Sequence, residues 1–400
     1  MREGPGVQSP TMSARERVLT ALAHKEPDRV AIEFGSPATL SIIDGEPYGY
    51  RALTSELDIR DAPPPILARA FSNSVTNVDD RILQRFGADL RWVGPGGPDV
   101  EELPSGNLFD PAWGYELIPL GAINQADDAN APLRGATDMA GIEAHPYWPD
   151  PSDARVVAGK SEEARAHREA GFAVVANPAV ACLIFHNYQR LRGFDTFMMD
   201  MYYEPRLFHA LCERLLEIDI AVMERFLPAV AASTDIVFMA DDLGSQNGLL
   251  VGPDQYREFL KPYQKRWIEA ARRLVPGAYI AYHSCGSFVE VVPDLIEIGV
   301  DILTPVQPLA RNMEHVRLKS EFGRELSFMG GIDTQKLLPR GTEADVRAAA
   351  RELIDTMGTD GGLIFSASHE LLPDVPAANI VAMFDEAQTY GRPMATRSGS

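Results

Sequence analysis

The stretch that decides the fold runs from Ala278 to Ser287 and reads Ala-Tyr-Ile-Ala-Tyr-His-Ser-Cys-Gly-Ser. Its first five residues have the composition of a buried strand, and a helix-like run over Phe288–Ile298 follows the turn. A His and a Cys two residues apart at the end of a strand can both point to one spot above a sheet. Imidazole and thiolate together suit zinc, although a lone Cys is also often buried as a small hydrophobe. The stretch therefore predicts a strand–turn–helix unit whose turn carries either metal ligands or packed side chains.

The same alternation of a short apolar run and a helix recurs along the chain. Eight runs have strand composition, near residues 30, 89, 172, 235, 278, 300, 326 and 362. Helices are expected between them, among others over Pro149–Ala170, Gln189–Met199, Glu204–Phe226 and Pro253–Leu274. This alternation is typical of a parallel sheet covered by helices. Eight units favour a single (β/α)8 barrel of the α/β class over residues 13–391, with an open doubly wound sheet as the alternative.

Three segments depart from the alternation. Residues 99–150 are rich in Gly, Pro and aromatic residues, which predicts a hairpin excursion or cap near the barrel mouth. Residues 1–12 and 392–400 are expected to be loose tails. Capping patterns at Ser13–Glu16 and Thr342–Asp345 mark the starts of two of the helices.

Composition restricts the class of protein. A hydrophobic content of 45% in 400 residues is ordinary for a globular enzyme with a large core. The net charge of -20 argues against nucleic acid and anionic membranes as partners. Three Cys residues are too few for a disulfide framework, which favours a reduced, cytoplasmic setting. The sequence has no apolar run of membrane-spanning length, no signal-peptide core, and no Walker, dinucleotide or G-x-S-x-G motif.

Polar residues follow the carboxyl ends of the predicted strands, where a barrel of this kind carries its reactive groups. They are Glu33, Asn177, Asp241, Asp242, His283, Cys285, Gln307, Asp333, Ser366 and His369. Some have structural alternatives, because one of the two adjacent Asp residues could cap a turn and Asp333 could cap a helix. His186 is expected to be packed or on the surface, and Phe197–Met201 to fill the core.

Several motifs resemble the uroporphyrinogen decarboxylase superfamily, from about residue 13 to residue 391. In the first part the likeness lies in Ser13-Ala-Arg-Glu-Arg-Val-Leu-Thr-Ala-Leu and His24-Lys-Glu-Pro-Asp-Arg29. It is strongest after residue 235, in Asp241-Asp-Leu-Gly-Ser-Gln246, His283-Ser-Cys-Gly286, Asp301-Ile-Leu-Thr-Pro-Val-Gln307, Gly330-Gly-Ile-Asp-Thr-Gln335 and His369 followed by Pro373-Asp-Val-Pro376. The resemblance implies a (β/α)8 barrel with a cleft at the carboxyl ends of its strands.

The superfamily contains two chemistries. True uroporphyrinogen decarboxylases carry an Arg-rich loop after the first strand, whereas the equivalent segment Phe34–Thr39 has no Arg. The chain is more similar to the methyltransferases of cobalamin-dependent systems, which carry zinc on a His-x-Cys pair and a later Cys. His283 and Cys285 match the pair, and His369 stands where that branch has its second Cys.

The imidazole at residue 369 changes the chemistry that the resemblance implies. Two thiolates nearly neutralise zinc, but one thiolate with two imidazoles leaves the centre about one unit more positive and a stronger Lewis acid. Such a centre suits an ether or hydroxyl oxygen. We therefore expect a methyltransferase that moves a methyl group from a small methoxy-type substrate to a separate corrinoid protein, because the chain has no Asp-x-His-x-x-Gly signature. A decarboxylase of a small carboxylate and a non-catalytic binding protein are the alternatives.

The resemblance also implies roles for individual residues. Zinc would be bound by His283, Cys285 and His369, with its fourth position open. Asp242 would orient a ligand or accept a proton. The substrate pocket would be lined by Glu33, Asn177, Gln246, Gln307 and Asp333. A homodimer is compatible with the sequence.

Overall fold

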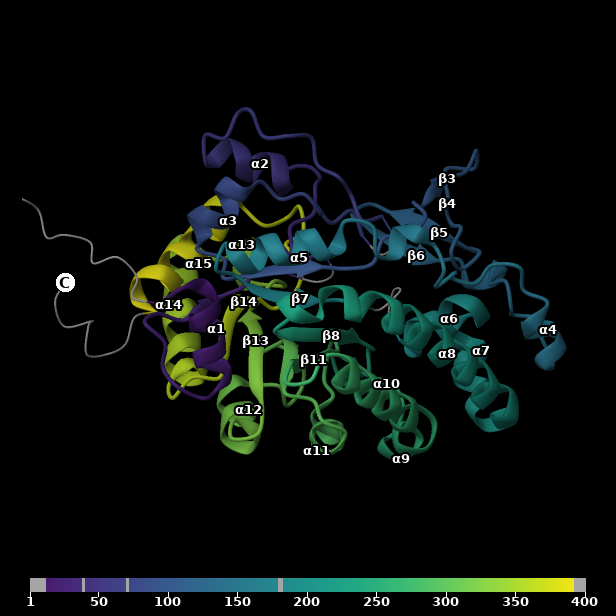
Figure 1. Cartoon of the computed structure of the whole chain (residues 1–400). Helices are drawn as coiled ribbons and strands as arrows, with labels where there is room; N and C mark the ends of the chain where they lie inside the picture. Colours follow the sequence, from purple (N-terminus) through teal and green to yellow (C-terminus); the bar gives the residue numbers. More distant parts are fainter. Residues whose placement is uncertain (1–11, 38–39, 70–71, 179–182, 392–400) are drawn as a thin grey trace, which may run out of the picture.

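The computed structural model describes residues 12–37, 40–69, 72–178 and 183–391, and their centre is a barrel of eight parallel strands (Figure 1). The strands are β1 (Ala31–Ile32), β2 (Leu90–Val93), β7 (Ala173–Ala176), β8 (Ile236–Ala240), β11 (Tyr279–His283), β12 (Ile302–Val306), β13 (Ser327–Ile332) and β14 (Leu363–Ala367). They pair in the order β1-β14-β13-β12-β11-β8-β7-β2. The predicted (β/α)8 barrel and all eight predicted strands are confirmed.

Strand β8 shows why these apolar runs form a barrel. All five of its residues are buried, and they alternate between two environments. Ile236 and Phe238 pack with residues of other strands inside the barrel, whereas Val237 and Met239 belong to the layer between strands and helices. A strand covered on both faces needs a continuous apolar run, which is the pattern in the sequence.

The barrel is closed between its first two strands by a buried carboxylate. The backbone N–H of Asp89 donates to the Ile32 carbonyl at 2.8 Å, and the Asp89 side chain accepts from the Ile32 N–H at 2.9 Å. Arg17 and Arg29 form ion pairs with the same carboxylate at 2.7 and 2.8 Å. Asp89 thus joins the two edges of the sheet where β1 and β2 share no strand ladder.

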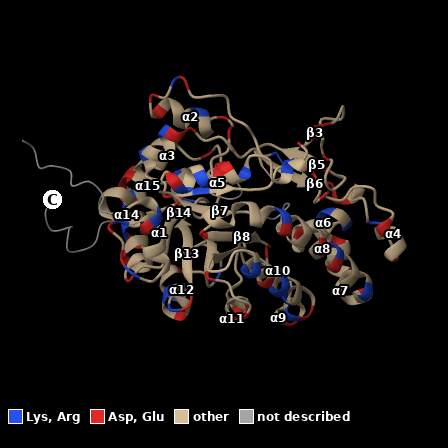
Figure 2. Cartoon of the chain, in the orientation of Figure 1, with Lys and Arg blue, Asp and Glu red and all other residues tan. Residues whose placement is uncertain are grey.

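Helices surround the barrel, and charged side chains lie mainly on them and on the loops (Figure 2). They include α1 (Ala14–Leu22), α2 (Gly49–Glu56), α3 (Asp80–Phe86), α5 (Lys160–Glu169), α8 (Pro205–Val230), α10 (Lys261–Leu274), α11 (Val292–Glu297), α12 (His315–Phe322), α14 (Glu343–Leu353) and α15 (Ala377–Tyr390). Both predicted capping patterns, at Ser13 and at Thr342, are complete capping boxes. In the described part of the chain, no helix has the length and apolarity needed to cross a bilayer.

Several predicted helices differ from the structure. The one expected over Pro253–Leu274 is divided into α9 (Pro253–Gln255), a π-helical turn at Tyr256–Leu260 and α10. The helix expected over Pro149–Ala170 begins only at Lys160, after a 3-10 turn at Ala154–Val156. The helix expected over Gln189–Met199 is two helices, α6 (Phe185–Arg192) and α7 (Phe194–Tyr203). Gly193 separates them with a φ of 87°, a conformation that ends a helix and favours glycine.

The excursion after β2 is a small sheet. Its strands β3 (Glu101–Glu102), β4 (Leu108–Asp110), β5 (Tyr115–Leu120) and β6 (Ile123–Ala126) form an antiparallel meander. This sheet and helix α4 (Met139–Glu143) lie on the same side of the barrel as α6, α7 and α8 (Figure 1). The expected tails lie outside the described residues, except Met12, whose N–H donates to Asp28 at 3.1 Å.

Candidate functional site

Three predicted metal ligands meet at the carboxyl end of the barrel. His283 is the last residue of β11, Cys285 lies in the turn after it, and His369 follows β14. One donor atom of each lies within 4.8 Å of the other two. Cys285 Sγ is 3.6 Å from His283 Nε2, and the two imidazole rings are 6.1 Å apart between centroids. Strands β11 and β14 are not neighbours, because β12 and β13 lie between them.

The turn that carries Cys285 is fixed by close backbone packing. Gly286 has a φ of 75°, and a Cβ at this position would lie 2.5 Å from the Ser245 carbonyl oxygen. The Gly286 N–H donates to Gln307 Oε1 at 2.9 Å. Gln307, predicted to contact substrate, instead holds the turn in place.

The donor set fits zinc. Two imidazoles and one thiol are the ligand types that zinc prefers, and each imidazole must be neutral to bind. Burial lowers the pKa of His369 to about 4, so its ring is neutral at pH 7. His283 Nδ1 has no hydrogen-bond partner among the described residues. The cluster therefore presents the neutral His369 ring beside the His283 imidazole and the Cys285 sulfur.

Asp242 connects this cluster to a third histidine. Its Oδ1 lies 3.4 Å from His283 Nε2, and its Oδ2 lies 3.4 Å from Nε2 of His186. It also accepts the Cys285 N–H at 2.7 Å. Burial raises the pKa of Asp242, but hydrogen bonding to His283 and the nearby His186 outweigh burial and hold this pKa well below its usual value. Asp242 is thus an anion in contact with both the His and the Cys of the pair.

The adjacent Asp241 has a different role. It is fully buried, and it accepts the Phe185 N–H at 2.6 Å and the Gln264 side-chain N–H at 2.9 Å. Burial raises its pKa to about 7. Asp241 therefore positions the start of α6, a structural role that differs from the turn cap expected for one of the two residues.

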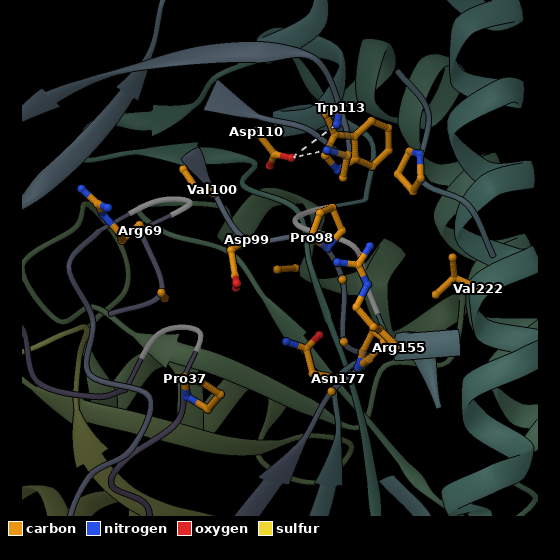
Figure 3. A pocket seen from close by; sticks show the side chains of 18 of the residues that line it. Pro37, Arg69, Pro98, Asp99, Val100, Asp110, Trp113, Arg155, Asn177 and Val222 are labelled. Atoms are coloured by element: carbon orange, nitrogen blue, oxygen red, sulfur yellow. Dashed lines mark hydrogen bonds between the residues drawn. The ribbon is translucent and has the colours of Figure 1, made fainter. Parts of the chain in front are cut away.

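A cavity of about 1100 Å³ lies over the cluster. Asp242, His186, His283 and His369 lie on its wall, together with Phe238. The rest of the wall comes from residues 94–100, from the excursion at residues 110–113 and from residues 148–150, with Arg69 and Arg155 (Figure 3). The excursion is therefore one wall of the cavity, as its prediction near the mouth implied.

Of the five predicted substrate contacts, only Asn177 lines the cavity (Figure 3). Glu33 is fully buried away from it, where Trp92 Nε1 donates to its carboxylate at 2.9 Å. Gln246 is exposed in the turn between β9 (Gly244–Ser245) and β10 (Gly248–Leu249). Asp333 accepts backbone N–H groups at the start of α13 (Leu337–Arg340), which is the capping alternative. Glu33, Asp333 and Gln307 thus bond to neighbouring groups of the protein, Gln246 is exposed, and none of the four lines the cavity.

Sequence reasoning missed most polar residues of the cavity wall, among them His186 and Glu370 near the cluster. His186, predicted to be packed or on the surface, reaches the cavity from α6, and burial lowers its pKa to about 4. Glu370 accepts hydrogen bonds from Ser72, at 2.8 Å, and from Ser74, and burial raises its pKa to about 7. Glu370 could have been found from its position next to His369, whereas the sequence around His186 carries no comparable signal.

The fold is a (β/α)8 barrel, and its cavity lies at the carboxyl ends of the strands, where barrels of this kind bind their ligands. Residues 178–390, more than half of the chain, match the family model described as uroporphyrinogen decarboxylase (URO-D). The chain belongs to the uroporphyrinogen decarboxylase family.

Similar proteins of known name include uroporphyrinogen decarboxylases by sequence and a methyltransferase by structure. The chain is 26% identical to a uroporphyrinogen decarboxylase of Chlorobium phaeobacteroides over 45% of its own length and 48% of that protein. It is 25% identical to the one of Tolumonas auensis over 50% and 54%, respectively, so it matches about half the length of these relatives. A methyltransferase from Methanosarcina mazei has a similar structure, with a TM-score of 0.59 and 17% identity over 95% of this chain and 99% of that one. This last likeness shows the shared fold.

Proposed function

We propose that this protein is a zinc-dependent methyltransferase that moves a methyl group from a small methoxy-type compound to a separate corrinoid protein. The observation that carries the proposal is the group of His283, Cys285 and His369, whose donor atoms lie within 4.8 Å of one another below the cavity. The methyltransferase from Methanosarcina mazei, which shares the fold over nearly the whole chain, is consistent with it.

Each residue of the cluster has a distinct part in this proposal. His283, Cys285 and His369 would hold zinc, which supplies a Lewis acid for an oxygen atom when bound. Asp242 keeps the pair in place, because it contacts the His283 ring at 3.4 Å and the Cys285 N–H at 2.7 Å. The His186 ring contacts the other oxygen of Asp242 and forms part of the cavity wall. The substrate oxygen would reach the cluster from the cavity.

The cavity wall argues against a porphyrinogen substrate. Its two guanidinium groups already have carboxylate partners, Arg155 with Asp153 at 2.5 Å and Arg69 with Glu102 at 3.2 Å. A polycarboxylate needs bidentate cationic partners, and none of the described residues offers an unpaired Arg in this cavity. A neutral or aromatic methyl compound has no carboxylates and therefore needs no cationic partner in the cavity. Decarboxylation of a small carboxylate is the second candidate function, because the chain is similar to proteins named uroporphyrinogen decarboxylases.

The metal content of variants tests the first part of the proposal. Wild-type protein should bind about one zinc per chain by elemental analysis, as should the control His167→Ala, which changes a histidine on α5 outside the cluster. Cys285→Ala and His369→Ala should both lose most of it. Full retention of zinc in His369→Ala would remove that residue from the ligand set.

A methyl-transfer assay tests the second part. Purified protein is mixed with a methoxyarene and reduced cobalamin, and formation of methylcobalamin is followed by absorbance. Wild-type protein should form it, and the two zinc-depleted variants should not. Release of carbon dioxide from uroporphyrinogen without any methyl transfer would favour the decarboxylase instead.

A further inference from the structure

The charges on the cavity wall are unequal. Among the described residues that line it, two guanidinium groups face six carboxyl groups, those of Asp99, Asp110, Asp150, Asp153, Asp242 and Glu370, although burial raises the pKa of Asp110 and Glu370. Arg155 is paired with Asp153 and Arg69 with Glu102, so neither is available to a ligand anion without losing its partner. Asp99, which Figure 3 shows at the cavity, raises the pKa of Arg155 through its charge but forms no salt bridge with any described residue. The wall therefore carries an excess of negative charge.

The same wall has an open hydrogen-bond acceptor. Asn177 lines the cavity, and its buried carbonyl oxygen Oδ1 has no hydrogen-bond partner in the described part of the chain. An amide oxygen accepts hydrogen bonds and so suits an N–H donor rather than an anion. The two Trp residues of the wall are not open to a cation, because Trp113 is 1% exposed and the Arg214 guanidinium lies 5.3 Å from the centroid of the Trp148 ring. The carboxylates and the open acceptor together point to a ligand that carries positive charge and N–H donors.

We propose that this cavity binds a positively charged methyl compound, an aromatic methyl ether that also carries an ammonium group, and that it discriminates against carboxylates of the same shape. The inference rests on the proposed function, which it deepens by naming the charge of the substrate. In this arrangement the cationic end lies near Asp99 and Asn177, while the methoxy end reaches His283 and His369. A cleft lined by one sign of charge also concentrates the opposite ion.

Three ligands of nearly equal shape test this proposal: 4-methoxybenzylamine, 4-methoxybenzyl alcohol and 4-methoxybenzoate. Their binding to the purified full chain is measured by titration calorimetry at pH 7, in low salt and in 0.5 M salt. We expect the amine to bind at least about tenfold more tightly than the carboxylate, with the alcohol between them. The difference should shrink in high salt, because exposed charges such as Asp99 are screened.

Two variants test which carboxylate causes the preference for the amine. Asp99→Lys, at an exposed position, should abolish the preference for the amine, whereas Glu101→Gln, on the exposed strand β3 outside the cavity, should preserve it. Equal or tighter binding of the carboxylate by wild-type protein, or binding of none of the three ligands, would overturn the proposal. Binding does not require methyl transfer, so a preserved charge order without methylcobalamin formation would contradict only the proposed function.

Discussion

The buried carboxyl group of Glu33 makes the stability of this barrel depend on pH. Glu33 lies just past β1 with no exposed surface, and Trp92 donates a hydrogen bond to one of its oxygens. Its other oxygen has no partner among the described residues. Burial raises the pKa of Glu33 to about 8, from an ordinary value of 4.5. Glu33→Gln keeps an acceptor for Trp92 and removes the ionisation.

The sign of the effect follows from the direction of the shift. Because the pKa is higher in the folded state, the unfolded chain loses this proton first and is favoured as pH rises. The stabilisation is fully present below about pH 4.5 and is lost as pH rises toward 8. At about 1.4 kcal/mol per pKa unit, three pH units give about 4 kcal/mol, and partial titration near pH 5 and pH 8 reduces the loss in the free energy of unfolding to about 3–4 kcal/mol. Glu33→Gln should not show this loss.

Urea unfolding followed by tryptophan fluorescence at pH 5, 6.5 and 8 measures the effect. The stability of Glu33→Gln relative to wild type should increase by about 3–4 kcal/mol from the lowest to the highest pH. Glu56→Gln, on an exposed position of α2, is the control and should follow wild type. A difference between wild type and Glu33→Gln that is constant across this pH range would refute the reasoning.

Two further variants test other features of the structure. Asp89→Ala should lower the free energy of unfolding by about 3–5 kcal/mol, because Arg17 and Arg29 lose the partner of a buried ion pair. A loss below about 1 kcal/mol in urea unfolding would show that Asp89 does not close the barrel. Asp242→Asn should weaken zinc binding by about 10- to 100-fold in a chelator competition, with an unchanged circular dichroism spectrum, because it supports the His283 ring and the Cys285 N–H. Unchanged zinc affinity would contradict that role.

The barrel could be predicted because its strands are covered on both faces. Runs such as Ile236–Ala240 are buried at every residue, so they are apolar throughout and visible in the sequence. The excursion lacks this signal. Both residues of β3 are exposed, and β5 ends in three exposed residues, so neither strand shows the alternation that marks a strand packed on a core. Its composition predicted a hairpin excursion or cap but not the four strands of the sheet or their bounds.

The candidate site could be predicted only in part, because the end of a strand fixes the position of a residue but not the direction of its side chain. Cys285 and His369 follow their strands and turn toward His283, whereas Asp333 turns back to cap a helix. Gln307 accepts a hydrogen bond from the neighbouring turn. His186 reaches the cavity from a helix, so a search restricted to strand ends could not include it.

The order of the donor residues along the chain has a consequence for assembly. His283 and Cys285 lie in one short turn and can approach each other as soon as β11 has formed, but His369 follows β14, the strand that pairs with β1. A partly folded chain therefore offers only two of the three donors, and a third is added when the last strand joins the first. If the protein binds zinc as proposed, tight binding requires that the first and last strands of the barrel have paired. A nascent chain would therefore hold no zinc tightly until its synthesis was nearly complete.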